Sequence, residues 1–120
     1  MESIAELLER NSGDPRIRLE LGQEFLTAFD SQNLPSDSFV LTQFCDVMVQ
    51  WLNGSNFKVA LLALDIIDAA LSVSGDLLAP YLLDNIVPLM ERFGDSKEQV
   101  RATAVELVIK FMSVPHCSPQ

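Results

Sequence analysis

The sequence has little of what catalytic and metal-binding sites are usually built from. It contains one His and two Cys among 120 residues, too few for the four Cys or His ligands of a typical structural zinc site. It has no glycine-rich phosphate-binding loop. Cys45 lies in an apolar stretch and Cys117 in a proline-rich tail, so we expect two reduced thiols rather than a disulfide.

Positive charge and long apolar runs are also scarce. Lys and Arg number 8 against 17 Asp and Glu, a formal net charge of −9, which argues against a nucleic-acid-binding protein. No stretch reaches the roughly 18 uncharged apolar residues that a membrane span needs, and the acidic start is unlike a signal peptide. The sequence therefore predicts no nucleic acid and no membrane among its partners.

The candidates for catalysis are weak. His116 and Cys117 are adjacent in the tail, but no motif supplies a group to orient or activate a Cys–His nucleophile. Carboxylates at helical spacing, such as Asp65 and Asp68, lack the signs of a cleft in which an acid–base pair could work. We therefore expect no enzyme, no cofactor and no metal site.

The residues that are present are patterned as helices almost throughout. Apolar residues recur at spacings of three and four, as in the series Ile17, Leu21, Phe25 and Phe29. Alternating segments flanked by hairpin turns, which would predict strands, are almost absent. Capping residues precede several helices; they are the Ser3–Glu6 box, Asp14 before Pro15, Ser55 or Asn56, and a second box of Ser96 and Gln99.

Two of the six predicted helices have unusual features. The helix from Phe57 to about Ser74 is apolar over most of its circumference, so it should be buried between neighbours, and Gly75 should end it. The next apolar segment, residues 77–93, contains Pro80 and Pro88. Because proline removes a backbone donor and clashes with the preceding turn, we expect a break or kink near one or both.

The six helices form three pairs that repeat along the chain. Ile17, Val59 and Val100 occupy the same place in the second helix of each pair, at intervals of 42 and 41 residues. A period near 40 is typical of HEAT repeats, whose hairpins stack because one hairpin cannot bury both its faces. We therefore predict an all-α, alpha-alpha superhelix (a HEAT-repeat solenoid) of six helices in three antiparallel hairpins. The hairpins should span about residues 3–30, 38–74 and 77–113, with a flexible tail at 114–120; a compact six-helix bundle is the alternative.

The few basic residues gather at the turns within the hairpins. In a stacked array these turns line one edge, which we call the turn ridge. Seven of the eight Lys and Arg residues fall there or just before it: Arg10, Arg16, Arg18, Lys58, Arg92, Lys97 and Arg101. Cations are unfavourable near helix N-termini, which are partly positive, so this placement predicts an external acidic partner. For a turn arginine, Arg101 above all, a packing role is the alternative.

Three segments resemble a known family. Residues 53–66 (NGSNFKVALLALDI) and 94–101 (GDSKEQVR) resemble the second and third repeats of a TOG domain, most closely the N-terminal TOG domain of CLASP proteins, which are microtubule rescue factors. Residues 18–26 resemble the second helix of these domains. The resemblance spans about residues 4–113 and implies the N-terminal half of such a domain.

The resemblance implies a non-catalytic binding module of a microtubule-dynamics regulator. TOG domains contact the acidic tubulin heterodimer through their intra-repeat turns, which implies tubulin or the microtubule lattice as partner and a location in the cytoplasm, on microtubules and the mitotic spindle. By position, the residues facing tubulin would be Arg16, Arg18, Asn56, Lys58, Lys97 and Arg101. Tubulin-binding TOG domains usually have a Trp in the first turn, and this turn has none; we expect Trp51 in the core instead.

Two further expectations concern apolar surfaces. A generic HEAT scaffold that binds a protein partner through its concave apolar face is the alternative function. The last helix also has more apolar residues than one stripe requires: Val105, Val108, Ile109, Phe111 and Met112. Some of them should point beyond the third repeat, so we expect self-association through this C-terminal apolar face.

Overall fold

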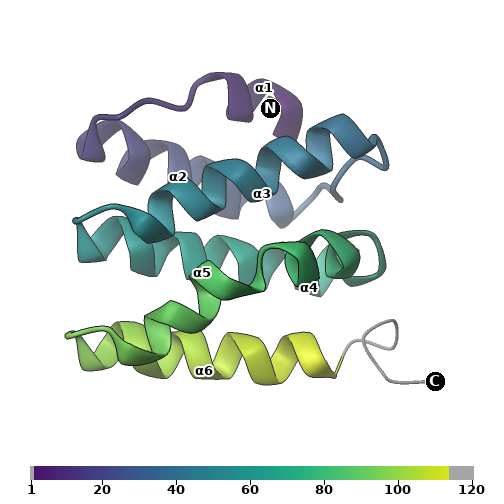
Figure 1. Cartoon of the computed structure of the whole chain (residues 1–120). Coiled ribbons are helices and arrows are strands. Elements are labelled where there is room, and N and C mark those ends of the chain that lie inside the picture. Colours follow the sequence, from purple (N-terminus) through teal and green to yellow (C-terminus); the bar gives the residue numbers. More distant parts are fainter. Residues whose placement is uncertain (1, 114–120) are drawn as a thin grey trace.

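The structure, a computed structural model, describes residues 2–113 of the chain (Figure 1). Within this range it contains helices and no strand, which confirms the all-α prediction. The helices are α1 (Ile4–Glu9), α2 (Pro15–Phe29), α3 (Ser38–Asn53), α4 (Phe57–Asp84), α5 (Ile86–Glu91) and α6 (Glu98–Met112), with a 3₁₀ helix η1 at Arg92–Gly94. None of these helices is both long and apolar enough to cross a bilayer. The predicted tail, with His116 and Cys117, lies outside the described residues.

The helices stack in three tiers (Figure 1). α1, α3, the part of α4 after Ser74 and α5 lie in one layer, and α2, the part of α4 before Ser74 and α6 lie in the second (Figure 1). The smallest dimension of the molecule is 22 Å, which corresponds to two layers of helices about 10 Å across. This side-by-side arrangement is the one expected for a HEAT-like solenoid.

α4 is the centre of the stack. It contacts α2, α3 and α6, and residues on several of its sides are buried, among them Leu62, Leu64 and Ile66. The approach to α2 is close at Gly22, where an added Cβ would lie 2.1 Å from a methyl carbon of Leu62. The prediction of a buried fourth helix is confirmed.

α4 consists of two helical segments that meet at the predicted end of the first one. Ser74 has a non-helical backbone (φ −141°, ψ 37°), where the chain turns back, and a second helical segment then continues to Asp84 (Figure 1). The Ser74 Oγ accepts a hydrogen bond of 2.8 Å from the buried N–H of Leu34, in the loop between α2 and α3. Gly75 does not adopt a positive φ, the conformation by which glycine usually ends a helix. The helix that begins at Phe57 therefore ends at about Ser74, as the sequence predicted, although Gly75 lacks the usual glycine conformation.

The predicted proline break occurs at Pro88. A proline clashes with the carbonyl four residues before it, and α4 ends at that residue, Asp84. The side-chain Nδ2 of the next residue, Asn85, donates to the carbonyl of Tyr81 at 2.8 Å, so a carbonyl near the helix end keeps a donor. Pro80 remains inside α4.

Most of the predicted helix caps form. Those present are the Ser3–Glu6 box, Asp14 and Asn56. The second predicted box, Ser96 with Gln99, is wrong, because the N-cap of α6 is Lys97 and its side chain makes no cap bond. The Asp95 carboxylate instead accepts from the Lys97 N–H at 2.9 Å, and an ionised acceptor makes a stronger hydrogen bond than a hydroxyl.

Trp51 and Cys45 are core residues. Trp51 is fully buried, as predicted, and its Nε1–H donates to the side-chain oxygen of Asn11 at 2.9 Å. The Cys45 thiol is free and buried, and burial raises its pKa to about 12. The thiol is therefore protonated at neutral pH and a poor nucleophile.

Candidate functional site

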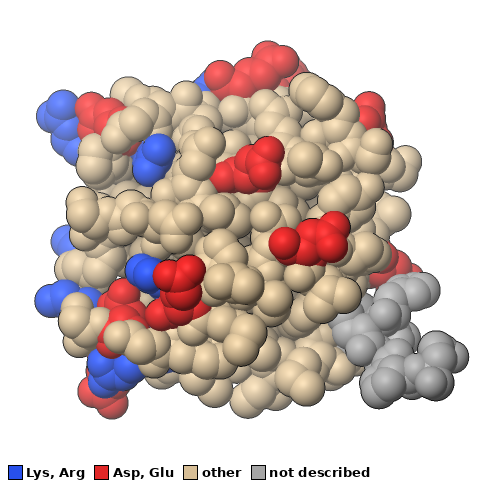
Figure 2. Space-filling view, viewed as in Figure 1, with Lys and Arg blue, Asp and Glu red and all other residues tan. Residues whose placement is uncertain are grey.

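The three intra-hairpin turns lie along one edge of the molecule, at the left of Figures 1 and 2. Lys and Arg side chains gather along this edge, together with some acidic ones, whereas the face over α3 and α5 has few charges (Figure 2). All six residues predicted to contact a partner lie at the N-terminus of α2, α4 or α6. The fold therefore brings them together on the turn ridge.

Two of these six residues are engaged inside their own turns. The Arg18 Nε donates to the carbonyl of Ser12 at 2.6 Å, and an Nη of Arg101 donates to the carbonyl of Asp95 at 2.7 Å. Both arginines are half-buried and occupy the same position in the first and third repeats. The packing role considered for Arg101 thus has a direct contact, and Arg18 makes the same one.

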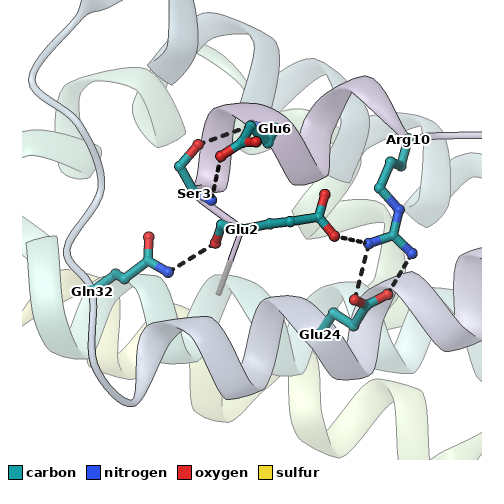
Figure 3. Close-up of polar contacts among 6 residues, drawn as sticks. All are labelled: Glu2, Ser3, Glu6, Arg10, Glu24 and Gln32. Carbon is teal, nitrogen blue, oxygen red and sulfur yellow. Dashed lines mark hydrogen bonds and ion pairs between the residues drawn. The ribbon is translucent and has the colours of Figure 1, made fainter.

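Arg10 is neutralised by two glutamates (Figure 3). Its guanidinium donates to both carboxylate oxygens of Glu24 in α2, at 2.9 and 2.6 Å, and also pairs with Glu2. The hydrogen bond with Glu24 raises the pKa of Arg10, and the same bond lowers the pKa of Glu24. Gln32 donates to the Glu2 carbonyl at 2.9 Å. Arg10 therefore joins the N-terminal segment to α2 and adds little positive charge to the turn ridge.

Arg16, Arg92 and Asn56 also have partners within the chain. Arg16 lies 3.4 Å from Asp14 but remains exposed, and Arg92 lies 3.4 Å from Asp95. The Asn56 Oδ1 accepts from two backbone N–H groups at the start of α4, at 3.0 and 3.3 Å. Its oxygen therefore serves as a helix cap.

Lys58 and Lys97 differ from the other cations. Both are exposed, and neither side chain has an ion pair or a hydrogen bond within residues 2–113. The Lys97 Nζ lies 4.9 Å from the ring centroid of Phe57, within cation–π distance, and Lys58 directly follows Phe57. In a chain with 17 acidic residues, these two lysines are the positive charges most available to a partner.

Comparisons with known proteins identify relatives of the chain. It is 41% identical over 113 residues, 94% of its length, to Protein CLASP-1 of Caenorhabditis elegans. It is 33% identical over 100 residues, 79% of its length, to CLIP-associating protein 1 of Xenopus tropicalis. The chain is homologous to the CLASP family. It spans only 8% and 7% of the length of these two relatives. No family model matches it, and no solved structure matches it significantly.

One residue of this CLASP homologue was not singled out from the sequence. Phe57 has the Lys97 Nζ over its ring and precedes Lys58 in the sequence, and it is half-buried at the first position of α4. The corresponding positions in the other repeats are Pro15 and Glu98. An aromatic residue in only one of three aligned turns was the available signal. Its contact with Lys97 could not be foreseen, because the two residues are 40 positions apart.

Proposed function

We propose that this chain is a non-catalytic binding module of a microtubule-dynamics regulator, half of a TOG-like domain that contacts tubulin through its turn ridge. The observation that supports this most directly is the pair of exposed, unpaired lysines, Lys58 and Lys97, in a chain of net charge −9. The CLASP homology supports a microtubule-related partner. An acidic tubulin surface would be attracted to this edge and oriented by it. The module would then act in the cytoplasm, on microtubules and the mitotic spindle.

The residues of the turn ridge would have two kinds of role. Lys58, Lys97 and the exposed Arg16 would face tubulin directly. Arg18 and Arg101, which donate to carbonyls of their own turns, would keep the turns in shape, as would the helix cap Asn56. This division refines the set of six residues that the sequence suggested.

Reversing the charge of both lysines, as Lys58→Glu with Lys97→Glu, should abolish binding to αβ-tubulin. The fold should remain, because substitutions at exposed positions usually change stability by less than about 0.5 kcal/mol. Co-elution with tubulin on size exclusion measures the binding, and circular dichroism with thermal melting measures the fold. Undiminished co-elution of a folded double variant would contradict the proposal.

A charge-matched control separates a local contact from the effect of net charge. Lys58→Gln with Lys97→Gln lowers the net charge by two, and so does Ser36→Glu with Thr42→Glu at exposed positions away from the turns. Only the first pair should weaken tubulin binding. Ridge binding should also weaken steeply with salt, whereas a generic HEAT scaffold that binds through an apolar face should be far less sensitive.

We also propose that the isolated chain self-associates through its C-terminal apolar face. This face has exposed apolar residues from the third hairpin: Leu83, Val87, Met90, Val105, Ile109 and Met112. Phe111 is buried and Val108 half-buried, so part of the apolar set noted in the sequence points outward.

Association through this face should increase with protein concentration and with salt. Salt screens the repulsion between two chains of charge −9 over about 8–10 Å and does not weaken apolar contact. Sedimentation velocity measures the effect, and Ile109→Glu, at a position 64% exposed, should return the chain to a monomer. A monomer at high concentration and high salt that binds no hydrophobic dye would show that the face is not adhesive.

A further inference from the structure

A groove lies beside Lys58, on the layer formed by α2, α4 and α6. Its volume is 380 Å³ and it runs between α2 and α4. The floor includes Leu19 of α2 and Phe57 and Leu61 of α4, all half-buried rather than covered. The groove therefore offers apolar surface to a partner next to the turn ridge.

The charges of the groove are ordered along its length. Lys58 and Asp65 both line it, and seven residues of α4 separate them by about 10 Å along the helix axis. Lys97 adds a second cation at the Lys58 end, where its Nζ lies over the Phe57 ring. The groove thus has a cationic end at the turn ridge, an apolar middle and an anionic end.

The cationic end is available because no residue in the range 2–113 forms an ion pair or a hydrogen bond with the side chain of Lys58 or Lys97. Four of the other basic residues, Arg10, Arg16, Arg92 and Lys110, have carboxylate partners, and the remaining two arginines donate to carbonyls. The aromatic part is also specific to this turn, since Pro15 and Glu98 replace Phe57 in the neighbouring repeats. The ring, the groove and Lys58 belong to the second turn, and Lys97 of the third turn reaches the same ring.

We infer that this groove binds an acidic segment of a partner protein, seating one apolar side chain on Leu19, Phe57 and Leu61 while an adjacent carboxylate pairs with Lys58 or Lys97. Asp65 sets the direction, because it repels a carboxylate at its own end and accepts an N–H or O–H there. The ion pairs govern orientation and association rate, and burial of the apolar side chain provides affinity. The inference rests on the proposed function in that it gives the acidic partner of the turn ridge a defined anchor.

A small probe tests the groove without tubulin. 4-Phenylbutyrate has a ring and a carboxylate, and 4-phenylbutanol is its uncharged counterpart. In ¹H–¹⁵N correlation spectra, phenylbutyrate should shift the amides of Phe57, Lys58, Leu61 and Lys97 with a dissociation constant of about 1–10 mM. The alcohol should bind several-fold more weakly, and Lys58→Gln with Lys97→Gln should remove the difference. Absence of saturable shifts, or equal binding of the alcohol, would overturn the inference.

Tubulin itself tests whether the groove is used at the turn ridge. Leu61→Ser should lower tubulin affinity about tenfold, as expected for losing part of the burial of a leucine-sized group, while its salt dependence stays the same. Leu83→Ser, on the C-terminal face, is the matched control, and melting curves show that both variants are folded. Unchanged tubulin affinity of Leu61→Ser would overturn the inference that the groove is a binding site, and it would not contradict tubulin binding by the turn ridge. Failure of the unmodified chain to bind tubulin, with phenylbutyrate still in the groove, would overturn the proposed function and assign the groove to another acidic partner.

Discussion

Leu64→Ala should lower the free energy of unfolding by about 2–5 kcal/mol. Leu64 is 0% exposed and lies in α4, which contacts α2, α3 and α6. Neighbours from three helices limit how far the surroundings can collapse into the space left by the leucine, so a cavity should add to the lost burial. A urea titration followed by circular dichroism measures the change.

Leu83→Ala is the matched control for this prediction, because it makes the same substitution in α4 on the other side of the break at Ser74. Leu83 is 61% exposed, so its truncation should stay within about 0.5 kcal/mol of neutral, as is usual for surface sites. A loss below about 1 kcal/mol for Leu64→Ala would mean that this part of α4 is not tightly packed.

Gly22→Ala should also destabilise the chain, by about 1–3 kcal/mol. Helix propensity alone predicts the opposite sign, since alanine is favoured over glycine inside a helix by about 1 kcal/mol. The new Cβ would lie 2.1 Å from Cδ2 and 2.6 Å from Cγ of Leu62. The Cγ atom is close to the backbone and Leu62 is buried, so rotation of its side chain alone cannot relieve the clash, and α2 and α4 must move apart.

A double-mutant cycle tests this contact. With Leu62→Ala in place, Gly22→Ala should become neutral or stabilising, so the two changes should couple strongly rather than add. Gly13→Ala serves as the control, because a Cβ at Gly13 has nothing within 4 Å. Equal or greater stability of the single Gly22→Ala variant in a urea titration would show that the two helices are not held this close.

The contacts of the arginines show where reasoning from sequence was incomplete. The sequence predicted their positions at or just before the intra-hairpin turns. It gave no sign of which of the seven cations have partners within the chain. The structure pairs Arg10 with Glu24, which is 14 residues away, and holds Arg18 against a carbonyl of its own turn. Sequence spacing places a cation at an edge of the fold, whereas its pairing depends on which acceptors the folded chain brings within reach.

Ile17 illustrates the same limit within the core. It aligns with Val59 and Val100, which are 2% and 0% exposed, yet Ile17 is 43% exposed. The repeat pattern predicts the same side of each second helix. α4 and α6 each pack on the second helix of the repeat before them, whereas α2 has no such helix before it among the described residues. Burial therefore depends on the place of the repeat in the stack as well as on its sequence.

The sequence by itself determined the helices, most of their caps and the stacking of three hairpins. These follow from local properties, namely the spacing of apolar residues, the side chains before each helix and a period near 40 residues. Tertiary structure alone decided the hydrogen bond between Ser74 and Leu34, the close approach of Gly22 to Leu62, and the separation of two unpaired lysines from six engaged basic residues. It also decided the groove beside Phe57. Each of these depends on side chains far apart in the chain that meet only when the helices pack, and no local pattern specifies such meetings.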